Sequence, residues 1–299
     1  MGGPELTIEQ RLKRIQNFID RMPSLSTTVT KVLEVCNKPN TSPNDLNRVI
    51  SLDPVLTGQV LKLINSAYYS LPNQITSLTR AIIMLGLNTV KNLAISTAVL
   101  GAMGNEKSFL LLPMDSFWIH SICVGVTAKA LAAKLGVPRP ELEEYFVAGL
   151  LHDLGKIPLN YRFAEEYKDS LDLANLEQGP LYRAEAMIFG FDHALVGKTI
   201  AEKWQLSSTI GETLGFHHDP EGASAANRKL VTVVALANLY ANVYEIGFAG
   251  DRFQEGPTIY RTLDLVGIKW GELAALQEAV AVEIDKAQVF LRVVGKGKG

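Results

Sequence analysis

Apolar residues recur at steps of three and four through most of the chain, which is the spacing of one face of an α-helix. A typical stretch carries Val49, Leu52, Val55, Leu56, Val60, Leu63 and Ile64 on its apolar positions. The alternation of apolar and polar residues that predicts a β-strand is nearly absent. The pattern therefore predicts an all-α fold.

Capping residues mark where several helices begin. Ser42-Pro43 and Asp53-Pro54 each place an N-cap side chain directly before a first-turn proline. Residues 101–114 interrupt the helical pattern with glycines, charges and a proline, so we predict a boundary there between two helical subdomains.

The predicted boundary divides the chain into three parts. We expect an N-terminal helical subdomain over residues 1–112, a second helical subdomain over residues 113–250, and a C-terminal helical extension over residues 251–299. Residues 270–294 read as one long amphipathic helix. Its apolar positions are Leu273, Leu276, Val280, Ile284, Ala287 and Leu291. These side chains need a surface to cover, so we expect this helix to pack on the rest of the protein.

Composition narrows the class of protein. Hydrophobic residues make up 47% of the chain, enough for a sizeable core. The net charge is −2 and no stripe of Lys or Arg occurs, so we expect neither a nucleic-acid nor a membrane partner. The N-terminus lacks the apolar core of a signal peptide, and we expect no apolar run to reach the roughly 20 residues of a membrane helix. The two cysteines, Cys36 and Cys123, lie far apart, which favours a reducing cytoplasmic setting.

The histidines suggest a metal site. There are five, each within or at the end of a predicted helix, and an aspartate follows the second: His120, His152-Asp153, His193, His217 and His218. A lone histidine on an apolar helix is more often a hydrogen-bonded core residue. Five histidines and an aspartate on five helices instead favour one or two divalent ions, with Fe, Mn, Zn and Ni all open.

The order of these residues resembles the HD superfamily of metal-dependent phosphohydrolases. The first half is similar to the HDOD domain, the HD-related output domain of bacterial signalling proteins. The similar segments include "MPSLSTTVTKVLEV", "ISLDPVLTGQVLKLINSAYYS", "EEYFVAGLLHDLGKIPLN" and "GFHHDP", and the resemblance covers about residues 18–245. It implies an N-terminal helical bundle packed on an HD-type bundle, which would hold the metal site within residues 113–250.

The resemblance also implies a role for each matching residue. The metal ligands would be His120, His152, Asp153, His193, His217, His218 and Asn238. Asn238 stands where active enzymes have an aspartate. Lys156 matches a lysine that touches a phosphate or a metal-bound oxygen, although a solvated surface lysine is an equally simple interpretation. The Gly-Tyr-Pro motif of cyclic-di-GMP phosphodiesterases is missing after His218.

Two functions follow from this set. The first is a regulatory output module of bacterial signal transduction that keeps most of an HD-type metal site. Its partner would be a signalling protein or a nucleotide or phosphate ligand. Tyr68, Tyr69 and Leu71 could present a partner surface if they are not simply core residues. The alternative is a metal-dependent phosphohydrolase, a phosphodiesterase or nucleotidase, in which Asp153 and Lys156 would be catalytic.

Overall fold

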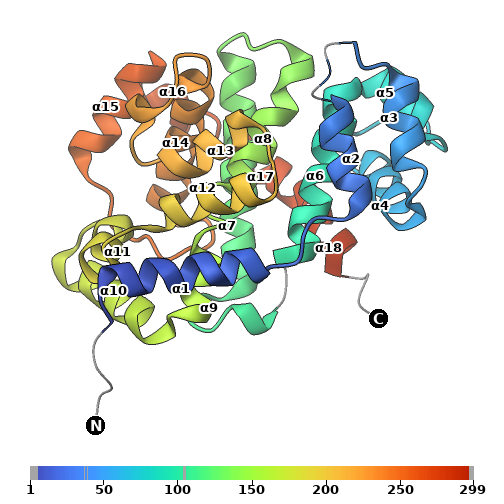
Figure 1. Ribbon diagram of the computed structural model, residues 1–299. Coiled ribbons are helices and arrows are strands. Elements are labelled where there is room, and N and C mark those ends of the chain that lie inside the picture. Colours follow the sequence, from blue (N-terminus) through green and yellow to red (C-terminus); the bar gives the residue numbers. More distant parts are fainter. Residues whose placement is uncertain (1–5, 37, 39, 104–105, 296–299) are drawn as a thin grey trace.

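The computed structural model describes residues 6–36, 38, 40–103 and 106–295, which form helices and connecting turns without a strand (Figure 1). The expected all-α fold is confirmed for this part of the chain. The first helices are α1 (Ile8–Arg21), α2 (Thr27–Cys36), α3 (Pro43–Ile50), α4 (Pro54–Ile64), α5 (Leu78–Leu85) and α6 (Leu87–Met103). Ser42 and Asp53 accept hydrogen bonds from the backbone N–H groups of Asp45 and Leu56, so both predicted caps are confirmed.

The helices that follow α6 form a second bundle. They are α7 (Met114–Lys134), α8 (Leu142–Leu151), α9 (Lys156–Arg162), α10 (Ala164–Glu177), α11 (Leu181–Phe189), α12 (His193–Lys203), α13 (Ser208–Phe216) and α14 (Arg228–Val243). The 3₁₀ helices η1 (Glu106–Ser108), η2 (Arg139–Glu141) and η3 (Pro220–Gly222) lie between them. Helix α7 packs against both α8 and α14, and α6 joins the first bundle to α8.

Helix α1 does not stay with its sequence neighbours but lies across the second bundle, against α12 and α9 (Figure 1). Lys203 donates a hydrogen bond of 2.6 Å to the carbonyl oxygen of Asp20, and the Trp204 indole donates one of 3.1 Å to that of Pro23. The N-terminal helix is therefore fastened at its C-terminal end to the bundle that carries all five histidines.

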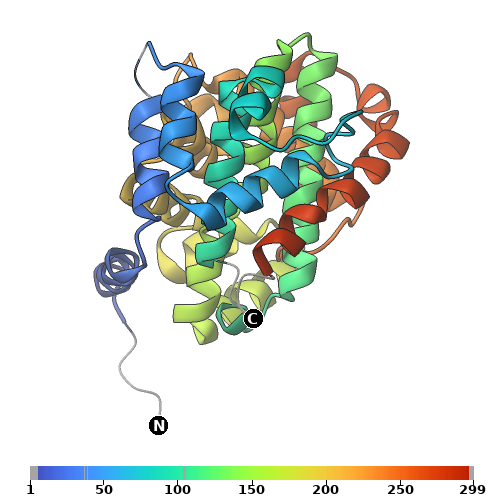
Figure 2. The ribbon, with the colours of Figure 1, turned by 90° about the vertical axis from the view of Figure 1, so that its right-hand side faces the viewer.

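The prediction of one long C-terminal helix is wrong in one respect, because the helix is interrupted twice, after Ala274 and after Ala287. The observed helices after α14 are α15 (Gly256–Val266), α16 (Trp270–Ala274), α17 (Gln277–Ala287) and α18 (Val289–Gly295). Helix α17 packs on α7, whereas α18 packs on α4 and α6 of the first bundle (Figure 2). A straight helix cannot cover both surfaces. Leu273, Val280, Ile284 and Ala287 are buried as expected, while Leu276 and Leu291 are half-buried.

An aromatic cluster holds α18 in place. The Phe290 ring is fully buried, and its centroid lies 5.5 Å from that of Tyr68 and 4.9 Å from that of Phe146. Tyr68 is itself buried, and the Tyr69 hydroxyl donates a hydrogen bond to the Glu143 carboxylate. Tyr68 is therefore a core residue that joins the two bundles, so the alternative of a partner surface is wrong for it, whereas Tyr69 is half-buried.

Replacing Phe290 with alanine should destabilise the protein by about 3–5 kcal/mol, since it empties a buried ring site shared by three elements. Urea denaturation followed by circular dichroism would measure the loss. Val282→Ala on the exposed face of α17, where the side chain is 54% exposed, is the control and should cost less than about 0.5 kcal/mol. Equal losses in the two variants would contradict a bridging role for α18.

In the described residues, α7 is long and apolar enough to cross a membrane by length and composition alone, and 72% of its most apolar window is buried inside the fold. The expectation that no apolar run reaches this length is therefore wrong. Helices α5 and α6 would be long and apolar enough to cross a membrane only if they formed one span, but the chain bends by 118° between them. The apolar length of α7 has a simple cause here, because α8, α14 and α17 surround it.

Candidate metal centre

Close helix packing brings the first three candidate ligands together. His120 lies in the middle of α7, and His152 and Asp153 follow the last residue of α8. A side-chain carbon added to Gly149 would lie 2.8 Å from the Cα of Gly125, so only glycines allow α7 and α8 to approach this closely. The pair of glycines thereby places His120 beside the His152-Asp153 turn.

A second close approach brings in His193. A carbon added to Gly155, two residues after Asp153, would lie 2.0 Å from the His193 carbonyl oxygen. Glycine is required at that position for the start of α12 to reach the turn. Asp192 caps α12, its carboxylate accepting from the N–H of Leu195, so His193 is the first helical residue.

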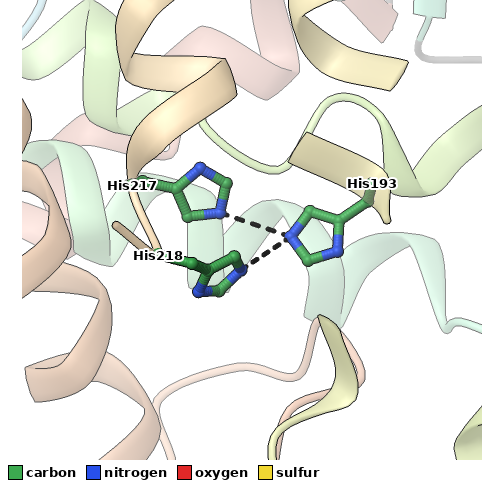
Figure 3. Close-up of side chains that lie close together, drawn as sticks. All are labelled: His193, His217 and His218. Atoms are coloured by element: carbon green, nitrogen blue, oxygen red, sulfur yellow. Dashed lines mark hydrogen bonds between the residues drawn. The ribbon is translucent and has the colours of Figure 1, made fainter. Parts of the chain in front are cut away.

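The histidines and the aspartate form two groups whose ligand atoms lie within 4.8 Å of one another. We call His193, His217 and His218 the three-histidine cluster, and His120, His152 and Asp153 the aspartate cluster. In the former, the Nε2 atom of His193 lies 3.3 Å from that of His217 and 2.9 Å from that of His218 (Figure 3). The structure thus brings six of the seven predicted ligands together.

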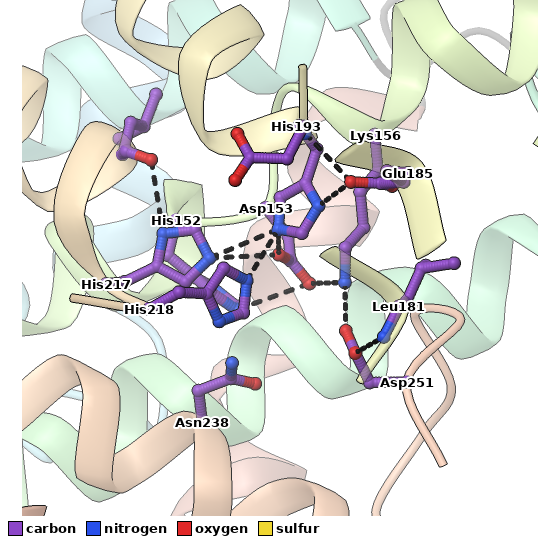
Figure 4. Close-up of polar contacts among 12 residues, drawn as sticks. His152, Asp153, Lys156, Leu181, Glu185, His193, His217, His218, Asn238 and Asp251 are labelled. Atoms are coloured by element: carbon purple, nitrogen blue, oxygen red, sulfur yellow. Dashed lines mark hydrogen bonds and ion pairs between the residues drawn. The ribbon is translucent and has the colours of Figure 1, made fainter. Parts of the chain in front are cut away.

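The Asp153 carboxylate lies between His152 and the imidazoles of the three-histidine cluster (Figure 4). Its Oδ1 atom is 3.3 Å from Nε2 of His193 and 3.6 Å from Nε2 of His217. Its Oδ2 atom is 3.3 Å from Nε2 of His152 and 3.7 Å from Nε2 of His120. One carboxylate therefore faces histidines of both clusters, the position that a carboxylate bridging two ions would take.

Hydrogen bonds on the outer side of two imidazoles turn their Nε2 atoms inward. Nδ1 of His152 lies 2.7 Å from the carbonyl oxygen of Gly149, and Nδ1 of His217 lies 3.1 Å from that of Leu214. A carbonyl can only accept, so each Nδ1 carries the proton and each Nε2 keeps its lone pair. Metal-bound histidines are oriented in this way.

Buried atoms without partners test whether these residues fit a cation. Among the described side chains, Nε2 of His120, Nε2 of His152 and Oδ1 of Asp153 are buried and make no hydrogen bond. Buried polar atoms are normally paired. Three acceptors aimed at one small volume are what a divalent ion requires, so the residues present fit a metal ion.

Burial and neighbouring charges also favour ligation. Burial lowers the pKa of His120 to about 3 and that of His217 to about 4, so both rings are neutral near pH 7 with lone pairs free to bind. Burial acts to raise the pKa of Asp153, but His152 and Lys156 beside it hold that pKa well below the usual value. His120 and His217 are therefore neutral imidazoles beside an ionised Asp153 carboxylate.

Lys156 is fully buried, so the alternative of a solvated surface lysine is wrong. Its ammonium lies 2.8 Å from Oδ2 of Asp153 and 2.6 Å from Oδ2 of Asp251, the other oxygen of which accepts from the N–H of Leu181 (Figure 4). Burial acts to lower the pKa of Lys156, but the two carboxylates raise it, so the lysine stays charged. It neutralises Asp153 and links it to the chain before α15.

Asn238 lies at the edge of the site and is nearly buried. It lines the same small cavity as His217 and His218, and its Oδ1 atom accepts a hydrogen bond of 3.1 Å from the amide of Asn242. That cavity has a volume of only about 20 Å³, close to the space of one water molecule.

Sequence reasoning missed Glu185, which is fully buried in α11. Its Oε2 atom accepts from both the backbone N–H of His193, at 2.9 Å, and Nδ1 of the same residue, at 2.5 Å. Burial alone would lower the pKa of His193, but the Glu185 carboxylate raises it to about 10. Glu185 therefore favours positive charge on this imidazole, whether a second proton or a metal ion at Nε2 supplies it.

Glu185→Gln should weaken binding of divalent ions by roughly 10- to 100-fold, the usual cost of losing an outer partner of a ligating histidine. The amide can still accept from Nδ1, so the fold should persist. Competition with a chromogenic chelator measures the affinity, and Glu202→Gln on the exposed side of α12 is the control. An unchanged affinity would show that Glu185 is only a structural partner of His193.

The sequence and the fold are similar to those of known proteins. A match to the HDOD domain spans residues 22–220. The chain is 25% identical over 252 residues to an uncharacterized protein of Treponema pallidum, covering 83% of this chain and 46% of that protein, so it spans about half of its relative.

Solved structures agree. An HDOD domain protein of unknown function from Geobacter sulfurreducens is 27% identical, with a TM-score of 0.72 and coverage of 95% of this chain and 98% of the other. A phosphohydrolase candidate from Shewanella amazonensis is 24% identical, with a TM-score of 0.69 and coverage of 94% and 97%, and that likeness shows the fold alone. Because the HDOD match covers more than half of the sequence, the chain belongs to the HDOD domain family.

Proposed function

We propose that this chain is a regulatory module of bacterial signal transduction that binds a phosphate-bearing ligand at an HD-type site with one or two divalent ions. One observation carries the proposal: two groups of buried imidazoles face each other across the single Asp153 carboxylate, with the Nε2 atoms of His120 and His152 unpaired. Membership of the HDOD family agrees with a signalling role.

The chain supplies a distinct set of donors for each ion. The three-histidine cluster would hold one and the aspartate cluster the other, with Fe, Mn, Zn and Ni all compatible with imidazole and carboxylate. A bound ion would lower the pKa of a water molecule and polarise a phosphoryl oxygen. Glu185 orients His193, and Lys156 fixes the position of Asp153.

The charge of the site favours binding over turnover, and its narrow entrance restricts the access of any ligand. Two divalent ions would bring four positive charges, whereas Asp153 is the one carboxylate among the six clustered side chains. Asn238 is neutral and cannot act as a base. The 20 Å³ cavity beside His217 and His218 is far smaller than the roughly 300 Å³ of a typical ligand pocket. We therefore expect hydrolysis to be slow or absent.

A metal-dependent phosphohydrolase, either a phosphodiesterase or a nucleotidase, is the second candidate. Both clusters are present, and the Lys156 ammonium lies 2.8 Å from Asp153. In this case Asp153 and Lys156 would be the catalytic residues, with the lysine stabilising negative charge that develops on the phosphate. A signalling protein as a direct partner is a further proposal and is compatible with both functions.

The two functions separate in one experiment on the full chain purified without chelator. Elemental analysis should find about one or two divalent ions per chain. Hydrolysis of bis(p-nitrophenyl) phosphate and of a cyclic dinucleotide, with added Mn²⁺ or Fe²⁺, should be slow. Rapid turnover of either substrate would favour the phosphohydrolase. A protein that takes up no ion even after loading would contradict both proposals.

A further inference from the structure

The segment from Gln254 to Thr262 covers the entrance of the candidate metal centre. The small cavity beside the metal centre is lined by His217, His218 and Asn238 on one side. On the other side it is lined by Gln254, Glu255, Thr258 and Thr262, which belong to the start of α15 and the chain before it. Because its volume is about 20 Å³, a phosphate-bearing ligand cannot enter unless this segment moves.

An ion pair at the rim holds the covering segment. Nη1 and Nη2 of Arg183 lie 2.5 Å and 2.8 Å from the two carboxylate oxygens of Glu255, a bidentate arrangement. The neighbouring Tyr182 ring stacks on the His218 imidazole, with centroids 4.2 Å apart. Arg183 is thus placed next to an aromatic ring that touches a candidate metal ligand.

The covering segment is attached to the second bundle along one face of α15, which packs on α14. Within α15 only Thr262 and Leu263 are buried, and Tyr260 is 70% exposed. Before the segment, buried Asp251 is held by Lys156, and beyond it Leu273 is fully buried. Arg183 and Glu255 are both partly solvent-exposed, and such pairs are weak and easily exchanged for another anion. Release of this pair would therefore free the start of α15 next to the cavity.

Resting on the proposed function, we propose that Arg183 is the phosphate-binding residue of this site and that Glu255 is its internal competitor. A guanidinium binds carboxylate and phosphate with the same bidentate geometry. The phosphomonoester group of a nucleotide takes the place of the Glu255 carboxylate on Arg183. Residues 252–266 then move away, and Tyr182 lies beside the bound ligand. Glu255 thus keeps the site closed until a phosphomonoester is present.

Calorimetric titration of the Mn²⁺-loaded full chain tests this inference, with adenosine monophosphate and inorganic phosphate as separate probes. Glu255→Gln should tighten binding of the nucleotide about tenfold, because the binding-competent state no longer competes with a carboxylate. Arg183→Gln should weaken it about tenfold or more, since a charge-assisted bidentate contact is lost. In the double variant the gain from Glu255→Gln should disappear. Inorganic phosphate that binds as tightly as the nucleotide would identify the free anion as the ligand.

Arg261→Gln is the matched control, because it breaks the other ion pair of the segment, with Glu221, and leaves Arg183 untouched. Hydrogen exchange over residues 252–266 should rise in Glu255→Gln and, in the unmodified protein, on addition of the nucleotide. Unchanged nucleotide affinity in Glu255→Gln, or in Arg183→Gln, would overturn the inference, as would absence of binding to Glu255→Gln. Metal analysis of the same samples keeps the two proposals apart. Metal-free protein after loading contradicts the proposed function, whereas loaded protein with unchanged affinities contradicts only the role of Arg183.

Discussion

Asp153→Asn should remove nearly all bound divalent metal from the protein. Asp153 is the one carboxylate within the two clusters, and its oxygens face histidines on both sides at 3.3–3.7 Å. The loss of an outer partner of a ligand already costs roughly 10- to 100-fold in affinity, so losing the shared carboxylate should cost more than about 100-fold. Elemental analysis after dialysis and chelator competition would measure the change.

Asp251→Asn is the matched control for this prediction. It removes the other carboxylate on Lys156, and therefore the same charge next to the same buried ammonium. Asparagine can still accept the hydrogen bond from the N–H of Leu181. We expect Asp251→Asn to keep its metal while both variants lose stability in urea. If the two variants lose metal equally, the effect of Asp153 comes from its ion pair with Lys156 rather than from ligation.

The sequence was sufficient for those features that depend on near neighbours in the chain. Caps such as Ser42 and Asp53 bind backbone N–H groups three residues away. Their sequence pattern therefore predicts them, and both cap hydrogen bonds are present in the structure. The sequence also indicated a metal site, because each candidate ligand falls within or at the end of a predicted helix: His120, His152-Asp153, His193, His217 and His218. The observed convergence of their side chains depends on close packing that the glycines at 125, 149 and 155 allow.

Features that depend on distant pairing were missed. Glu185 precedes His193 by eight residues, and Lys156 precedes Asp251 by 95, so no local spacing connects either pair. The sequence does contain a pattern that could have pointed to Glu185, because this residue lies on the buried face of α11 with Leu181, Ala184 and Phe189. A carboxylate among apolar positions is costly to bury without a partner, and that cost could have indicated its role.

The C-terminal helix shows a different limit. Apolar spacing over residues 270–294 is helical, and the segment is helical, but spacing does not reveal which surface each turn must cover. The bends after α16 and α17 let successive turns reach α7 and then α4 and α6. Tertiary packing therefore decided where the helix breaks, and packing of this kind overrides local propensity.

Asn238→Asp should strengthen metal binding and bring hydrolytic activity if substrate can enter. The change places a second carboxylate at the edge of the site, where it can offset the charge of an ion, and its oxygen can still accept from the amide of Asn242. A second carboxylate in a buried site should lower the dissociation constant for Mn²⁺ by about tenfold or more. Chelator competition gives the affinity, and bis(p-nitrophenyl) phosphate gives the activity.

Gln254→Glu is the control for that variant. Gln254 lines the same cavity as Asn238, so the change adds one negative charge near the site without altering a candidate ligand. We expect it to change Mn²⁺ affinity by less than about threefold, because position 254 lines the cavity from the chain before α15 and supplies no ligand to either cluster. Equal gains in the two variants would mean that general charge, rather than ligation from position 238, limits metal binding. Asn238→Asp with more metal but no hydrolysis would instead point to the closed entrance over His217 and His218 as the barrier, which combining it with Glu255→Gln should then relieve.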